Sequence, residues 1–497
     1  MRLTCPQRRL DGLPIREVKL NRNCRDEIIP ILCALQHLYG NADLRNRLLH
    51  LVGRDVNRDT SRRHGRRGLS YWEIIVLAAV RLGCNLDYDK LQDLAENHRS
   101  LRQIMGLGDW QEEVDFDWRR LEDNLNKLRP ETLQQLSALV VKAGHALEPR
   151  AIQAVRCDSF VVETNIHHPT ESALIGDGLR KILPLAAQLA AAHGLGGWRQ
   201  HQHWLRKVRR LTRAISQAAR AKSRGVERLK PGYRQLLQLA RDLLARARRL
   251  LSALTLMVEP PLTVSQLQQA VPPAQRERLL CHYVGLTAQV CDTARRRVLE
   301  GETVANDDKI FSLFEPHTEL IKRGKQPVEI QYGHNVLVVE DAVGFVIEHR
   351  VVDRGVLDQD LVVPVMRKLQ KDHHGKIQSA SFDRAFHTPE NQQELAALVR
   401  TPCLACKGEE QGRQQVRQGT VAFRQARQRH PGVESAIGVL QSGNGLKRCR
   451  NRGQRGYQRY VALGVLGHNL HILGKLLLAR EDAHCQAAQS KRKRWAG

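Results

Sequence analysis

The chain has 497 residues, a length that predicts more than one domain with ample buried apolar surface. Its 79 Lys and Arg residues exceed its 52 Asp and Glu residues, so the formal net charge is +27, which favours a polyanionic partner such as nucleic acid. No stretch of membrane-spanning length is free of charge, and residues 1–20 lack the apolar core of a signal peptide, which argues against a membrane protein.

Two residue classes narrow the expectation further. Aromatic residues make up only 4% of the chain, which argues against base stacking on single strands and favours contacts with duplex phosphates. The 11 cysteines have no regular spacing, as is typical of reduced thiols in a cytoplasmic protein. We therefore expect a cytoplasmic, nucleoid-associated protein that binds double-stranded DNA.

Residues 1–149 are predicted to be helical, with a basic run at Arg62–Gly68 that forms a loop or arm. Three short helices between Ser70 and Gly106 are compatible with a helix-turn-helix module that reads DNA. A small helical bundle without any role in DNA binding has the same pattern, so both interpretations stay open. The predicted helices are Ile28–Leu38, one capped by Ser70 and closed by Gly83, Tyr88–Asn97, one capped by Ser100 and ended by Gly106, Trp118–Leu128 and Glu131–Ala143.

An apolar, β-branched run at Ala154–Thr164 predicts a strand with Asp158 near its middle. Burying this carboxylate costs several kcal/mol, by rough estimate, unless it meets a metal ion or a partner. An edge strand with Asp158 in solvent is the alternative that this stretch alone leaves open.

A helical region at 167–305 follows the strand and interrupts the sheet. Apolar residues spaced three and four apart from Leu229 to Leu254 predict a coiled-coil-like seam. The outward faces are crowded with arginine, which repels itself unless an anion is present, although a solvated surface is the simpler alternative. The predicted phosphate contacts here are Arg206, Lys207, Arg209, Arg210 and Arg213.

Strand patterns return beyond the helical region, so residues 150–166 and 306–480 together predict one α/β core with a mixed sheet. Residues 481–497 form a basic tail that we expect to lack regular structure. The predicted elements are strands Val328–Val339, Gly344–Val352, Ile377–Phe382 and Pro402–Ala405, a helix from Asp358 or Asp360 to Leu369, a helix starting at Thr388-Pro389, a helix containing Glu434, and a helix Tyr460–Leu478.

Three carboxylates stand out by position: Asp158 within the first strand, Asp383 at the end of a later strand, and Glu434 on a helix. Phosphodiester chemistry on DNA uses two divalent ions held by carboxylates on a rigid scaffold, together with substrate phosphates. Spacing alone is weak evidence, because 52 acidic residues offer many such triples.

The same residues also lie in segments that carry a family resemblance, and together these segments are specific. They resemble bacterial insertion-sequence transposases of the ISNCY group over most of the chain, and the helices from Leu69–Trp72 to Leu107 resemble the amino-terminal domain of that group. The resembling core segments are Cys157–Arg180, Ser381–Asn391, Val433–Ile437, Gly445–Gly453 and Tyr460–Leu470.

The resemblance implies an RNase H-like catalytic core with a DDE triad at Asp158, Asp383 and Glu434, which would bind Mg²⁺, with Mn²⁺ as a substitute. It also implies cutting and joining of transposon ends, which must be brought together, so a homodimer or larger assembly is expected. The N-terminal helices would then bind DNA. Additional predicted phosphate contacts are Lys447, Arg448, Arg450 and Arg452.

One departure concerns the position seven residues after Glu434, where related transposases often have a basic residue and this chain has Gln441. Lys447, Arg448 and Arg450 are candidates for the missing contact. Glu409 and Glu410 compete with Glu434 for the third carboxylate. The alternative functions are an RNase H-like nuclease that cuts without joining, and an inactive DNA-binding derivative.

Several other residues carry weaker signals. Glu163 is an odd number of residues from Asp158, so it is expected to face away from that carboxylate. His387, four residues after Asp383, is a candidate substrate contact. The remaining candidates are Cys403 and Cys406, which are half of a zinc motif and are expected in the core, and the pairs His167–His168 and His373–His374, which are expected in loops.

Overall fold

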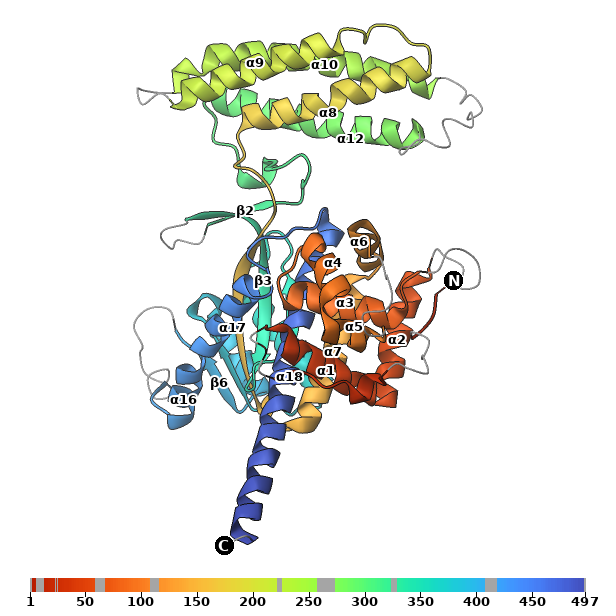
Figure 1. The fold of residues 1–497 in the computed structure, drawn as a ribbon. Helices are drawn as coiled ribbons and strands as arrows, with labels where there is room; N and C mark the ends of the chain where they lie inside the picture. The colour runs from red at the N-terminus through yellow and green to blue at the C-terminus, as the bar shows by residue number, and fades with distance from the viewer. Residues whose placement is uncertain are drawn as a thin grey trace. The chain divides into compact units, whose positions relative to one another are not determined.

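The computed structural model describes residues 2–5, 13–22, 24, 26–58, 68–107, 116–220, 226–256, 273–322, 329–406 and 418–495. Two compact units emerge: residues 1–165 with 333–497, which we call the core unit, and residues 166–332, which we call the bundle unit. Figure 1 shows the elements of both. The predicted basic arm, except Gly68, and the competitors Glu409 and Glu410 lie outside the described residues.

A mixed sheet forms the centre of the fold, and most of the rest of the chain is helical. Its strands follow the order β2-β3-β1-β5-β6, and β4 also pairs with β3. β1 and β4 run antiparallel to β3, whereas β1, β5 and β6 are mutually parallel. The strands are β1 (Ala154–Glu163), β2 (Glu319–Lys322), β3 (Ile330–Asp341), β4 (Val346–Val351), β5 (Ser379–Phe382) and β6 (Thr401–Leu404).

β1 occupies a central position, with β3 on one side and β5 on the other. The prediction that this strand lies beside the strand leading to Asp383 is therefore confirmed, and the edge-strand alternative is wrong. The physical reason is visible in its burial, because Val155, Cys157, Phe160, Val161 and Val162 are all buried and need cover on both faces. β2, a short and half-exposed strand, was not predicted.

Successive side chains of β1 point to opposite faces of the sheet and belong to different apolar clusters. Val155 and Cys157 pack against α13 (Val362–Asp372) and α14 (Pro389–Leu398) in one apolar cluster. Phe160 and Val162 belong to a second cluster that includes α7 (Pro130–Leu147), α17 (Pro431–Ser442) and α18 (Gln454–Trp495), all within the core unit. The N-terminal helices contribute to this second cluster as well, so they share one core with the sheet.

Apart from α2, which was not predicted, the N-terminal helices lie where the sequence predicts them, and their caps explain why. Ser70 and Glu73 form a reciprocal capping box, and Asp117 caps the helix that follows it. The short helix before Gly106 is capped by His98 instead of Ser100, because the His98 ring accepts the Leu101 N–H at 3.1 Å. The helices are α1 (Ile28–Gly40), α2 (Ala42–Val56), α3 (Tyr71–Gly83), α4 (Tyr88–Asn97), α5 (Arg99–Met105), α6 (Trp118–Leu125) and α7.

α18 is the longest helix of the described residues and continues through Trp495, where the sequence predicted an end near Leu478 and an unstructured tail. No Gly or Pro follows until Gly497, and the intervening Ala, Arg, Glu and Gln residues favour a helix, so the expectation of an unstructured tail is wrong. Its first half is apolar and long enough to cross a membrane, yet 67% of that window is buried inside the protein. This burial fits the central helix of a core.

The described residues of the bundle unit form mainly four long helices, which lie side by side (Figure 1). Their apolar stripes form a separate core, which includes Tyr233, Leu236, Ala240, Leu243 and Leu250 of the predicted seam. The predicted coiled-coil-like seam is therefore confirmed as the buried face of one helix. The helices are α8 (Glu171–Ala192), α9 (His201–Arg220), α10 (Lys230–Thr255) and α12 (Pro273–Ala294), and a π-helical turn (Arg295–Leu299) extends α12.

Candidate active site

Two aspartates lie beside each other on neighbouring strands, Asp158 near the middle of β1 and Asp383 directly after the end of β5. In the parallel register, Cys157 pairs with Phe382. Asp158 and Asp383 each follow this pair directly, so their backbones are neighbours although the chain between them contains the whole bundle unit, β3, β4 and α13. Adjacent parallel strands about 5 Å apart place such side chains within reach of one cation.

Glu434 lies in the first turn of α17, and α17 packs on β1. Arg156 of β1 fixes the approach of this helix, since its Nη1 donates to the carbonyl of Arg429 at 3.0 Å. Gly432 lies against the same guanidinium and leaves no room for a Cβ atom. The side chain of Glu434 is exposed, at the open side of the sheet edge.

His430, which precedes α17, joins this arrangement from the β5 side. Its Nδ1 is 3.1 Å from the Ser381 hydroxyl, two residues before Asp383. Burial and the nearby Arg427 lower the pKa of His430, while Asp383 and Glu434 act in the opposite direction. Sequence patterns did not single out His430; its position immediately before the helix that carries Glu434 was the available signal.

Burial, and to a smaller extent the neighbouring carboxylates, affect the charge state of Asp158. Burial, followed by the negative charges of Asp383, Asp358 and Glu434, raises the pKa of Asp158 to about 6, although the Ser159 N–H stabilises the charged form. Neither Asp158, Asp383 nor Glu434 forms an ion pair with another described residue. The negative charges of these three carboxylates are therefore not balanced by an ion pair, although the chain as a whole has a net charge of +27.

This donor set fits a hard divalent cation, because carboxylate oxygens are the ligands that Mg²⁺ prefers and the repulsion among them would be relieved by positive charge. Within the described ranges, no three His, Cys, Asp or Glu side chains converge on one coordination point. The three carboxylates would therefore have to close on an ion as it binds. Asp158 within β1, Asp383 directly after β5 and Glu434 on α17 are the residues that could hold it.

Asp358 is an acidic residue of this edge that the sequence patterns did not indicate. It is the first residue of a 3-10 turn (Asp358–Leu361) that leads into α13. The Ser159 hydroxyl donates to Asp358 Oδ2 at 2.9 Å, which places this carboxylate beside the strand position that follows Asp158. No local pattern marks this proximity, because it arises from the packing of α13 on the sheet.

The basic residues of the loop between α17 and α18 divide into two groups. Arg448 forms an ion pair with Glu163 at 3.0 Å, and Arg450 donates to Asn85 at 2.5 Å and to the Tyr460 hydroxyl at 2.9 Å. These two side chains are engaged within the protein. Lys447 and Arg452 are exposed. The backbone N–H of Lys447 donates to the carbonyl of Gln441 at 3.2 Å. A lysine therefore lies next to Gln441, the position at which related transposases often have a basic residue.

The predicted basic face of the bundle unit is exposed along α9. A groove between α8 and α9 is lined by Arg209, Arg213 and Arg220, together with Arg180, which is paired with Asp177 at 2.7 Å. Another groove, between α10 and α12, carries Arg234, Arg241 and Arg248 at seven-residue intervals. The side chains of Arg206, Lys207, Arg209, Arg210 and Arg213 are all exposed.

The weaker candidates fall outside the acidic edge or remain structural. Cys403 lies on β6 with its side chain buried, and burial raises the pKa of its thiol to about 11, as expected for a core cysteine. Cys406 is also buried. Glu163 is held by its ion pair with Arg448. The remaining histidines have these positions: His167 is 3.4 Å from Asp177, His168 contacts Tyr332, His373 contacts His145, His374 has a positive φ of 53°, and His387 follows the turn after Asp383.

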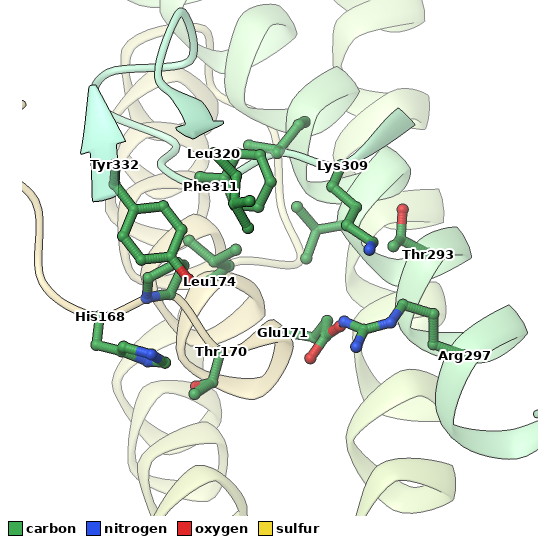
Figure 2. Close-up of a pocket in the computed structure, with 13 residues that line it drawn as sticks. His168, Thr170, Glu171, Leu174, Thr293, Arg297, Lys309, Phe311, Leu320 and Tyr332 are labelled. Carbon is green, nitrogen blue, oxygen red and sulfur yellow. The ribbon is translucent and has the colours of Figure 1, made fainter. Parts of the chain in front are cut away.

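A cavity of about 270 Å³ lies within the bundle unit, where the start of α8 meets the end of α12 (Figure 2). Lys309 and the ion pair between Arg297 and Glu171 face Phe311 and Tyr332 across it. Its single carboxylate, Glu171, is neutralised by this arginine. The cavity therefore lacks a set of acids comparable to the sheet edge.

Comparison with known proteins identifies a family for part of the chain. Residues 396–473 match the family model described as a transposase DDE domain. The matched segment runs from α14 into α18, so it includes Glu434 but begins after Asp383. It supports a DDE transposase family for the chain, and such transposases act on DNA and generally use a divalent metal ion. No curated protein and no solved structure matches the chain.

Proposed function

We propose that this chain is a DNA transposase that binds transposon ends, hydrolyses the phosphodiester bond at each end to free a 3′-hydroxyl, and joins that hydroxyl to target DNA. The observation that carries this proposal is the parallel register of Cys157 with Phe382, which makes Asp158 and Asp383 neighbours. The family match around Glu434 supports the same conclusion from an independent part of the chain.

The sheet supports an RNase H-like arrangement of the catalytic core. Three antiparallel strands, β4, β3 and β1, are followed by the parallel strands β5 and β6, with α13 and α14 covering one face. The bundle unit interrupts this core after its first strand. The ISNCY resemblance implies an RNase H-like core, and the sequence patterns predicted that a helical region interrupts it.

In the proposed mechanism, Asp158, Asp383 and Glu434 would hold divalent cations, Mg²⁺ or Mn²⁺, next to the scissile phosphate. When bound, the metal would activate the attacking oxygen and stabilise the leaving oxygen. The protein supplies position and charge neutralisation, without a covalent protein intermediate. The Glu434 side chain is exposed and would be free to change its rotamer when substrate binds, whereas Arg156 holds the start of its helix in place.

Exposed basic side chains of both units would bind DNA phosphates. Lys447 and Arg452 lie in the loop that follows α17. On α9, the exposed side chains form a positively charged surface that consists of Arg206, Lys207, Arg209, Arg210 and Arg213. The helices α3 to α5 are proposed to contribute to the recognition of the ends. Because two ends must be cut and joined together, we propose a homodimer or larger assembly in the DNA complex, in the cytoplasm with the nucleoid.

The test uses a labelled duplex that carries the DNA flanking the gene, incubated with the full-length protein and Mg²⁺. We expect metal-dependent nicking at the element ends, loss of nicking in Asp158→Asn, and retention in Glu163→Gln, which alters a carboxylate on the same strand. If Asp158→Asn cuts as fast as the wild type, the proposed site is wrong.

The same reaction separates the alternatives. Products longer than the substrate, formed by joining to a target plasmid, distinguish a transposase from an RNase H-like nuclease that only cuts. Tight, salt-sensitive duplex binding without any metal-dependent cleavage would identify an inactive DNA-binding derivative.

A further inference from the structure

Two basic grooves lie on the bundle unit, and they share no helix. The first runs between α8 and α9 and has a volume of about 640 Å³, and the second runs between α10 and α12 and has a volume of about 480 Å³. α8 contacts α9 and α12, and α10 contacts the same two helices, which places α9 and α12 at opposite corners of the bundle. In a four-helix bundle with this arrangement, the two grooves face in opposite directions.

A row of arginines lines each groove. The α9 row consists of Arg209, Arg213 and Arg220, and the α10 row consists of Arg234, Arg241 and Arg248. The side chains of both rows are exposed. At a helical rise of about 1.5 Å per residue, the α10 row is about 21 Å long, which corresponds to roughly six base pairs of duplex DNA. Each row can therefore follow a duplex backbone over several phosphates.

The acidic residues that line the two grooves are already paired with other arginines. Asp177 pairs with Arg180 at 2.7 Å in the first groove, and Asp292 pairs with Arg295 at 2.8 Å in the second. α9 contains no acidic residue, and α10 contains one, Asp242. Across the described part of the chain, no arginine of either row forms an ion pair. Both rows thus present positive charge that no carboxylate balances.

Phosphate is the anion that such rows match best, because a guanidinium donates two parallel hydrogen bonds to one phosphate. The helices of the bundle are packed about 8–10 Å apart, so the two rows are separated by a body roughly 20 Å thick. A single duplex that followed both rows would have to bend around this body, although DNA stays stiff over about 150 base pairs. Each row therefore accommodates a duplex of its own.

We propose that the bundle unit binds two duplexes at once, one along the α9 row and one along the α10 row, and so bridges two DNA segments. This inference rests on the proposed function, since it takes DNA as the ligand. It goes beyond that function because a single chain, and not only an assembly of chains, would hold two segments together. The second segment would be the other transposon end or the target.

The experiment measures bridging by the full-length protein without a metal ion, so that no DNA is cut. One duplex is immobilised on beads and saturated with protein, and after washing a second, fluorescent duplex is added and its capture is measured. The α10 variant combines Arg234→Glu, Arg241→Glu and Arg248→Glu. We expect it to bind one duplex but to capture at least about tenfold less of the second. The corresponding change to Glu in the α9 row should reduce capture in the same way.

The matched control changes the exposed residues Arg367, Lys371 and Lys376 of the core unit to Glu, with the same change in net charge. It should capture the second duplex like the wild type. Mass photometry in solution counts duplexes per chain, and we expect this ratio to fall from two to one in both row variants. Retained binding of one duplex shows that each variant is folded.

Bridging can also arise when two chains associate and each holds one duplex. In that case the α10 variant would capture the second duplex like the wild type, with one duplex per chain, and the inference would be wrong while the proposed function stands. Loss of single-duplex binding in both row variants would mean that the rows act on one duplex, and equal loss of capture in the core-unit control would mean that total charge determines bridging; either result refutes the inference. If the wild type binds no duplex at all, the proposed function fails as well.

Discussion

The acidic edge of the core unit and the basic surface of the bundle unit carry opposite charge and are built in opposite ways. The edge gathers Asp158, Asp358, Asp383 and Glu434 from positions far apart in the chain, through strand register and helix docking. On the α9 surface, the helical periodicity of His201–Arg220 alone decides which basic side chains face the solvent, so their arrangement does not depend on contacts between distant segments. A site of the first kind is sensitive to single substitutions, whereas a surface of the second kind is redundant.

The largest effect should come from Asp383→Asn. We expect the rate of metal-dependent end cleavage to fall on the order of 1000-fold, because one of the two neighbouring aspartates is removed, while duplex affinity stays the same. Single-turnover cleavage and filter binding on one preparation would measure the two quantities. Equal losses in both would mean that the acids and the DNA surface are not functionally separate.

The next largest effect is expected from Arg156→Met, which tests the scaffold of the acidic edge. Arg156 Nη2 pairs with Glu340 Oε2 at 2.9 Å, and burial raises the pKa of Glu340 to about 7. Losing this partner should lower the free energy of unfolding by roughly 3 kcal/mol at pH 8.

The pH dependence of this variant has a definite sign. A carboxyl whose folded pKa is raised favours folding below its unfolded pKa, and that contribution is lost as pH rises through about 7. The destabilisation by Arg156→Met should therefore be smaller at pH 5, where Glu340 is protonated, than at pH 8. Urea unfolding at both pH values measures it, and an equal or larger loss at pH 5 would contradict the ion-pair account.

A smaller effect is expected from changing Arg206, Arg209 and Arg213 together to Glu. Duplex affinity should fall by about 10- to 100-fold at low salt, and the slope of log affinity against log salt should decrease by roughly 3. The control changes the exposed residues Arg367, Lys371 and Lys376 of the core unit to Glu, with the same change in net charge. If both triple variants bind equally weakly, total charge and not the α9 surface determines affinity.

The smallest effect is expected from Thr388→Ala. Thr388 caps α14 by accepting the Asn391 N–H at 3.1 Å, so its loss should cost about 1 kcal/mol in the free energy of unfolding. Cleavage should change little, because the Asn391 amide still holds the Phe386 and Gln359 carbonyls. A loss of cleavage comparable to that of Asp383→Asn would show that the cap controls the position of Asp383.

Local patterns predicted the parts of this molecule that local energetics determine. The β-branched run around Asp158, the Thr388-Pro389 helix start and the Ser70 cap all have the structures expected of them. α2 was missed although Leu44, Leu48 and Val52 have helical spacing behind the Asn41 cap, so its signal was present. Asp358 could not have been selected, because its position depends on how α13 docks and not on neighbouring residues.

The connection between β1 and β3 bears on how this fold could have been assembled. Glu163 pairs with Gly333 in the antiparallel ladder, so the two points where the chain leaves and re-enters the core unit are adjacent residues of one ladder. In topological terms, β1 and β3 form a β-hairpin, and the loop of this hairpin is the bundle unit, which has a hydrophobic core of its own. Because closing a longer loop costs only slightly more entropy, such a module can be gained, exchanged or lost at this hairpin while the strand register that aligns Asp158 with Asp383 is kept.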